Sequence, residues 1–224
     1  MDQTFPQTGV LVRTGAERAT LVRRTYLLVL GGVALTMVGV AFTMTQPALM
    51  ALVAKHPFIS FLFTLAPLFM AQRAKERYPA NIGLTLLFTF TIGVWISPIM
   101  AFYATTQPGV IGQAGMLTFS AFGVLTAYAW VSKRDFSAWG SFFVVGLWVL
   151  IATSVLNMFF KNESASLWLS GMTVLIFSGL LIFDTWRIRN VYGPDDYVDA
   201  AVSIYLDLLN MFMAILHLLG GRRD

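Results

Sequence analysis

Long apolar runs are the feature that most limits what this chain can fold into. Between residues 25 and 219 the sequence repeatedly continues for about 20 residues with few or no charged side chains. A helix of that length crosses the roughly 30 Å hydrocarbon layer of a membrane. Charged residues make up only 12% of the chain, about half the share that soluble domains carry. The sequence therefore predicts an all-α, polytopic membrane protein.

Charged residues, glycines and prolines mark where the apolar runs end. Seven transmembrane helices are expected at about residues 25–45, 57–76, 81–103, 112–131, 138–160, 166–187 and 197–219. Residues 1–24 then form a polar N-terminal segment, residues 25–219 the membrane domain, and residues 220–224 a short tail. The short connections leave no room for a separate soluble domain.

Lysine and arginine are distributed unevenly between the two sides of such a bundle. Seven crossings place eleven of the 15 on the side of the N-terminus: Arg13, Arg18, Arg23, Arg24, Arg73, Lys75, Arg77, Lys133, Arg134, Arg187 and Arg189. Because cytoplasmic loops carry the excess of basic residues, the N-terminus is predicted to be cytoplasmic. Arg222 and Arg223 in the tail fit this poorly. A re-entrant last helix, which would return the tail to the cytoplasm, remains the alternative.

The remaining composition excludes several classes of function. The net charge of +4 comes from basic residues in loops, as membrane topology requires, so no nucleic-acid partner is expected. The chain contains no cysteine, which excludes disulfides, thiol catalysis and cysteine-ligated metals.

Two carboxylates lie inside apolar runs, Asp184 in the sixth expected helix and Asp207 in the seventh. An acid within a membrane span costs roughly 2.5–3.5 kcal/mol on insertion scales, and such residues usually mark a functional site. Both are expected in the cytoplasmic half of the bundle, because the sixth helix ends there and the seventh begins there. The alternative is that each reaches interfacial water and has no function.

A polar stripe along the seventh expected helix points to its place in the bundle. Asp199, Ser203, Asp207 and Asn210 follow one another at i+4, i+4 and i+3 steps and so share one helical face. A polar face within a membrane should turn toward the protein interior or water. The seventh helix is therefore predicted to be central.

The chemistry of two such acids favours protons and hard cations. Two carboxylates in a poorly solvated space cannot both ionise cheaply, so the pair is expected to hold one proton near neutral pH. Without that proton, the pair is an anionic oxygen site suited to a divalent cation such as calcium. A nearby arginine would compete with the cation. Arg73 ends the short second span at the membrane boundary. The alternative is that Arg73 is an ordinary interfacial anchor beside Lys75 and Arg77.

Several short motifs in this same region match a known family. They are Phe183-Asp184-Thr185, the pair Asp196-Tyr197, Ala200-Ala201, and Tyr205-Leu206-Asp207 followed by Asn210. With them, the stretch from residue 179 to residue 219 resembles the transmembrane Bax-inhibitor-motif family of small seven-helix proteins. The resemblance extends weakly over the rest of the chain, through the number of spans and the loop lengths.

The resemblance implies a pH-sensitive calcium leak in the bilayer of a bacterial inner (plasma) membrane. Asp184 and Asp207 would share a proton and bind the passing calcium ion, with no organic cofactor, and Arg73 would act as a latch. Some bacterial relatives lack the second aspartate and resemble modulators of a membrane-bound AAA protease. This chain keeps both acids, which favours the leak. Binding a membrane-bound AAA protease without transport is the alternative function.

Catalytic alternatives fit the sequence poorly. Intramembrane aspartyl proteases place Gly-x-Gly before the second acid, whereas Ile204-Tyr205-Leu206 precede Asp207. A rhomboid-like serine protease would need Gly-x-Ser-Gly, and Trp168-Leu169-Ser170-Gly171 lacks the first glycine. The chain is therefore predicted not to be an enzyme.

Overall fold

The computed structural model describes residues 15–74 and 77–221. Helices account for nearly all of these residues, and the described part contains no strand. In chain order the helices are α1 (Gly15–Met44), α2 (Pro47–Lys55), α3 (Pro57–Arg73), α4 (Ala80–Thr106), α5 (Val110–Val131), α6 (Trp139–Phe160), α7 (Glu163–Asn190) and α8 (Tyr197–Gly220). The all-α prediction is confirmed. Arg13, Lys75 and most of the expected tail lie outside the described residues.

The expected spans match the observed helices closely, with two differences at the N-terminal side. Helix α1 begins at Gly15, ten residues before the expected start, because its polar first turns continue the helix beyond the apolar run. The connection expected after residue 45 instead contains α2, which begins with a proline in its first turn and is only nine residues long. Within the described residues, six helices are long and apolar enough to span a membrane. A seventh span exists if α2 and α3, bent by 104° at their junction, count as one.

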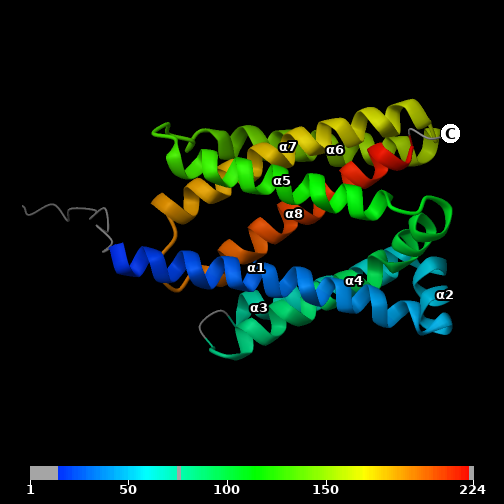
Figure 1. The fold of residues 1–224 in the computed structure, drawn as a ribbon, viewed down its shortest axis with the longest axis horizontal. Coiled ribbons are helices and arrows are strands. Elements are labelled where there is room, and N and C mark those ends of the chain that lie inside the picture. Colours follow the sequence, from blue (N-terminus) through cyan, green and yellow to red (C-terminus); the bar gives the residue numbers. More distant parts are fainter. Residues whose placement is uncertain (1–14, 75–76, 222–224) are drawn as a thin grey trace, which may run out of the picture.

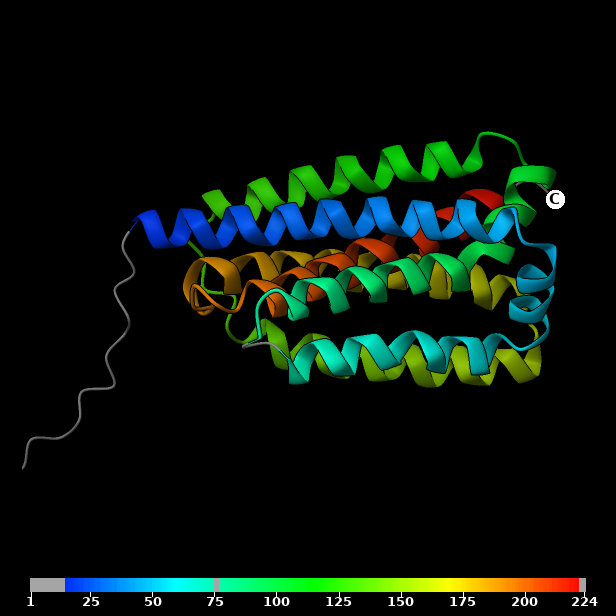
Figure 2. The same ribbon diagram turned by 90° about the horizontal axis from the view of Figure 1, so that it is seen from below.

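The long helices run alternately in opposite directions along the bundle, and α2 turns across the end where α1 finishes (Figures 1 and 2). Helix α8 crosses the middle of the bundle and packs against α1, α4, α5 and α7. None of its residues is fully exposed. The prediction that this helix is central is therefore confirmed.

Helices α1 and α4 approach each other closely at a pair of glycines. A Cβ atom added to Gly39 would collide with the backbone of Phe90, and one added to Gly93 would collide with the backbone of Thr36. Small residues that let two backbones come together are a common basis of helix packing in membranes. The tight contact holds Thr36 beside α4, where its hydroxyl bonds the carbonyl oxygen of Thr89 at 3.0 Å.

Gly93→Ala should lower the stability of the fold by about 1–3 kcal/mol, the usual cost of overpacking a tight contact. The new methyl group would push α1 away from α4 because its neighbour is backbone, which cannot rotate aside. The thermal unfolding midpoint in detergent measures the effect. Gly83→Ala on the same helix is the control, since a Cβ there meets nothing within 4 Å. Equal midpoints for the two variants would show that the close contact is not stabilising.

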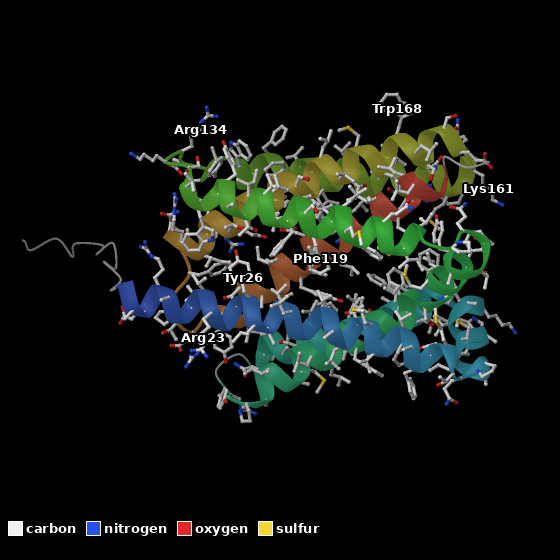
Figure 3. All side chains as sticks on the ribbon, viewed as in Figure 1. Arg23, Tyr26, Phe119, Arg134, Lys161 and Trp168 are labelled. Carbon is white, nitrogen blue, oxygen red and sulfur yellow. The ribbon has the colours of Figure 1, made fainter. Side chains whose placement is uncertain are left out.

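The charged loops separate to the two ends of the bundle. Arg23 and Arg134 lie at the end where α1 begins, and Lys161 lies at the opposite end (Figure 3). This separation fits the alternating topology expected from the sequence. Which end faces the cytoplasm stays a prediction, based on the excess of basic residues at the end where α1 begins.

Reporter domains fused after Arg134 and after Lys161 should lie on opposite sides of the membrane, with the Arg134 fusion in the cytoplasm. The reason is that α6 separates the two positions. A green fluorescent protein, which fluoresces inside, and an alkaline phosphatase, which is active outside, give complementary readings. The same location for both fusions would contradict the crossing of α6, and the reverse pattern would contradict the orientation.

Candidate functional site

Asp184 lies on the buried face of α7, about one and a half turns before the helix ends, and is 6% exposed. Its Oδ1 atom accepts a hydrogen bond of 3.0 Å from Nη1 of Arg187. The two residues are three positions apart, which brings their side chains together on one helix face. The basic partner of Asp184 is therefore on its own helix.

Arg187 fills the space between the acid and the surface of the protein. Its guanidinium group lies 4.5 Å from the centre of the Tyr192 ring and 5.6 Å from that of Phe183. Cation–π contacts of this kind hold an arginine in one orientation. The Arg187 side chain is 32% exposed, against 9% for that of Asp184. Arg187 thus covers the carboxylate on the side of the α7–α8 turn.

Tyr192, in the turn between α7 and α8, supports this cover. Burial raises the pKa of its phenol above the usual value, although the charge of Arg187 acts in the opposite direction. The hydroxyl group therefore stays neutral near physiological pH. It lies within hydrogen-bonding reach of Ser203 on α8. Tyr192 joins the arginine on α7 to the polar stripe on α8.

Asp207 is the deepest charged group of the site and is 4% exposed. Its carboxyl group lies within hydrogen-bonding reach of the Asp184 carboxyl group. Its Oδ2 atom is buried and has no hydrogen-bond partner among the described residues. Buried polar atoms are nearly always hydrogen-bonded, so this oxygen needs a partner that the described donors do not supply, such as a shared proton, a water molecule or a cation.

The rest of the predicted stripe lies on the same face of α8, but its members differ in their contacts. Asp199 and Ser203 are half-buried and adjoin Tyr192 near the α7–α8 turn. Asn210 is also half-buried, and its amide donates to the carbonyl oxygen of Leu206 at 2.8 Å. The stripe therefore leads from the turn to the acid pair and ends one helical turn beyond it.

Arg73 does not contact the acid pair in this structure. It is the last residue of α3 and its side chain is exposed. Helix α3 packs mainly against α4, on the side of the bundle away from α7 (Figure 1). The latch role predicted for Arg73 is therefore not seen in this structure, where Asp184 pairs with Arg187 instead. Arg77 is likewise exposed.

Two carboxylates are a small set of ligands for a metal ion. Calcium takes six to eight oxygen ligands when it is held firmly. The described residues contain no group of three or more His, Asp or Glu side chains that could hold a metal. Asp184 and Asp207 could therefore supply two ligands to an ion in transit, with the remaining ligands coming from water.

A second polar junction fixes α8 just before the acid pair. The Tyr205 hydroxyl lies 2.7 Å from Oγ1 of Thr36 on α1, which in turn reaches the carbonyl oxygen of Thr89 on α4 at 3.0 Å. Tyr205 is only two residues from Asp207. Three helices are thus joined within one helical turn of the deeper acid.

The comparison with protein families matches the sequence of this chain to a known group. A family model described as "Inhibitor of apoptosis-promoting Bax1" matches residues 18–224, nearly the whole chain. The chain belongs to the Bax inhibitor family. The acid pair of this family member lies within the matched region.

Relatives of this Bax inhibitor family member occur in bacteria, animals and viruses. A membrane protein of Vibrio cholerae is 34% identical over 222 residues, which are 96% of this chain and 95% of that protein. Protein lifeguard 4 of Mus musculus is 32% identical over 205 residues, 90% of this chain and 85% of its own length. The Golgi anti-apoptotic protein of vaccinia virus is 35% identical over 160 residues, 71% of this chain but only 66% of the viral protein. None of these names describes an enzyme.

Sequence reasoning found the two acids but missed Arg187 and Tyr192. A local signal for Arg187 was present, because a basic residue three positions after an acid on a helix is placed to pair with it. Tyr192 carried no such signal. Its ring meets Arg187 only because the turn between α7 and α8 folds back over the site.

Proposed function

We propose that this protein is a pH-sensitive calcium leak of the bacterial inner membrane, with its N-terminus in the cytoplasm. The observation that supports this most is the buried pair of Asp184 and Asp207, in which one oxygen of Asp207 has no partner. A carboxyl pair that is shielded from water and covered by an arginine can respond to both protons and cations. The family membership is consistent with a membrane function of this kind.

The pair would act as the gate through its charge. With one shared proton it carries a single negative charge, which Arg187 can balance through its bond to Asp184. Loss of that proton leaves a second negative charge in a poorly solvated place, which favours an additional cation. A calcium ion that enters between the carboxylates would weaken the hold of Arg187. Protons and calcium would therefore compete for one place.

In the proposed leak, this arrangement of α8 would correspond to a closed state. The polar stripe reaches only as far as Asn210. Between Asn210 and His217, α8 has only apolar side chains. Nε2 of His217 lies 3.1 Å from the hydroxyl oxygen of Ser166 on α7. An ion that reached the acids from the cytoplasmic end would meet this apolar segment next. Opening would require α8 or its neighbours to move in that half of the bundle.

Calcium entry into sealed vesicles tests the proposal. The purified full chain is reconstituted into vesicles that contain a calcium-sensitive dye, and calcium is added outside at several pH values. We expect a flux that depends on pH and exceeds that of empty vesicles. A flux equal to that of empty vesicles at every pH would refute the leak. It would favour the alternative of a non-transporting protein that binds a membrane-bound AAA protease.

A further inference from the structure

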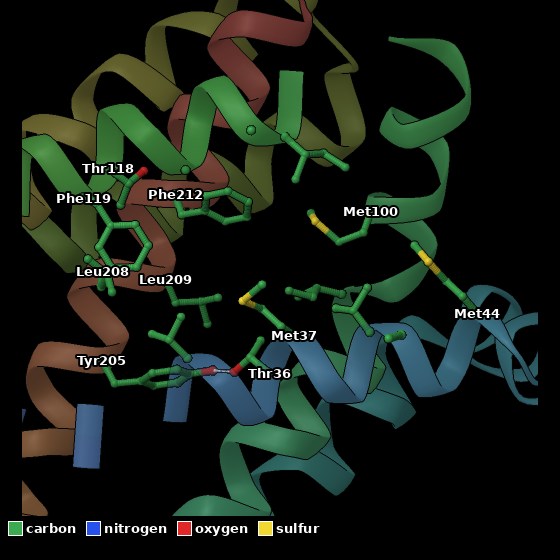
Figure 4. Close-up of a pocket in the computed structure, with 17 residues that line it drawn as sticks. Thr36, Met37, Met44, Met100, Thr118, Phe119, Tyr205, Leu208, Leu209 and Phe212 are labelled. Atoms are coloured by element: carbon green, nitrogen blue, oxygen red, sulfur yellow. Dashed lines mark hydrogen bonds between the residues drawn. The ribbon is translucent and has the colours of Figure 1, made fainter. Parts of the chain in front are cut away.

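A groove opens on the side of the bundle between α1 and α5, and α8 forms its floor (Figure 4). Its volume is about 470 Å³, within the roughly 300–1,000 Å³ that is typical of small-molecule pockets. The groove exists because α1 packs mainly against α4, whereas α5 packs mainly against α7 and α8. Helix α8 packs against both walls, and α4 contributes Ile96 and Met100 to the lining.

The groove offers no free polar group to a ligand. Its polar lining residues are Thr36, Thr118 and Tyr205. The hydroxyls of Thr36 and Tyr205 lie 2.7 Å apart and pair with each other, and Thr118 bonds the carbonyl oxygen of Ala114 at 2.7 Å. All other lining side chains are apolar. An ion, a sugar or a nucleotide would therefore lose its hydration here without gaining a partner.

The groove opens toward the place where lipid tails lie. Its rim includes Met37 on α1 and Phe119 on α5, which are 68% and 46% exposed. Both belong to helices that are long and apolar enough to span the membrane. The groove lies toward the ends of α1 and α4, away from the basic end of the bundle. The groove therefore opens into lipid tails, in the half of the membrane that lies away from the basic loops.

We propose that this groove binds one acyl chain of a membrane phospholipid. The proposal does not rest on the calcium leak. Flexible methionines at positions 37, 44 and 100 line the groove. Unbranched thioether side chains adapt well to apolar partners of variable shape.

Two glycines leave space in the α5 wall of the groove and are suitable positions for variants that fill it. A Cβ atom added at Gly112 or at Gly115 meets nothing within 4 Å, so larger side chains there have room to extend into the groove. Gly123 lies on the same helix, is exposed, and is equally free of close neighbours, but it does not line the groove. Gly115→Leu and Gly123→Leu are therefore a matched pair of variants.

The test uses phosphatidylcholine that carries a photoreactive diazirine near the end of one acyl chain. The full-length protein is reconstituted with this lipid, irradiated, digested and analysed by mass spectrometry. Because no residue of α8 is fully exposed, strong labelling near Leu209 and Phe212 requires a chain to enter the groove. We expect α8 to be labelled in the unmodified protein and in Gly123→Leu. The label on α8 should fall severalfold in Gly115→Leu.

Gly112→Leu provides a second block in case Gly115→Leu does not fold, as judged by thermal unfolding. An excess of unlabelled phosphatidylcholine should also reduce the α8 label in the unmodified protein. An unlabelled α8 in the unmodified protein would overturn the proposal and point to a protein helix as the occupant. Equal labelling of α8 in the folded groove-filling variants and in Gly123→Leu would overturn it as well.

Discussion

Asp207→Asn is expected to abolish the pH dependence of calcium flux, and Asp184→Asn alone should have the same effect. The two carboxyl groups lie within hydrogen-bonding reach of each other in a buried site. When either acid is replaced by asparagine, a single carboxylate remains, so there is no second negative charge for a shared proton to neutralise. The double variant should therefore add little to either single one, because groups that act as one unit are not additive, with couplings of about 0.5–3 kcal/mol.

The measurement is the vesicle flux as a function of pH for both single variants and the double variant. Asp195→Asn is the control, since this acid is exposed in the turn before α8. It should leave the pH profile unchanged. Two separate shifts that sum in the double variant would show that Asp184 and Asp207 titrate independently, and the gating proposal would then fail.

Arg187→Ala should increase calcium flux about tenfold at a fixed pH. A tenfold change corresponds to about 1.4 kcal/mol. Exposed ion pairs typically contribute about 0–1 kcal/mol, and breaking a buried pair costs about 3–5 kcal/mol. An intermediate value is expected here because the Arg187 side chain is partly exposed whereas Asp184 is buried. Without the guanidinium group, Asp184 loses its 3.0 Å hydrogen bond and the site loses its cover on the side of the turn.

Arg73→Ala and Arg77→Ala are the matched controls, because both side chains are exposed. Arg187→Lys should give an intermediate flux, since lysine keeps the charge but loses the planar contact with Tyr192. If Arg187→Ala behaves like the controls, Arg187 does not close the site. If Arg73→Ala alone raises the flux, the latch lies on α3, as the sequence predicted, and α3 must approach the acids in another state.

The spans and the acid pair could be predicted because each produces a strong local signal. An apolar run of membrane length has few alternatives to a helix, and an acid within such a run is too costly to be common. Helix α2 was missed because its nine residues, which begin at Pro47, are too short to span a membrane and fall in an expected connection. The expected start of the second span at Pro57 agrees with the first residue of α3.

The separation of Arg73 from the acid pair could not be predicted in the same way, although the position of Arg187 three residues after Asp184 was itself a local signal. Arg73 and Arg187 both fall at the cytoplasmic end of expected spans, so their depth in the membrane does not distinguish them. Whether Arg73 can reach the acids depends on which helix packs beside α7, and α3 packs mainly against α4 instead. Long-range packing of this kind leaves no periodic pattern in a single sequence.

The central position of α8 has a consequence for how the protein is made. Helix α8 follows α1, α4, α5 and α7 in the chain, so ribosomes produce all of its neighbours before it. Until α8 is synthesised, these helices surround a space that lipid must fill. Asp199 and Asp207 then leave the translocon toward a partly assembled bundle, and not toward bare lipid. The neighbours that later form the site would thus assist the insertion of the helix that completes it.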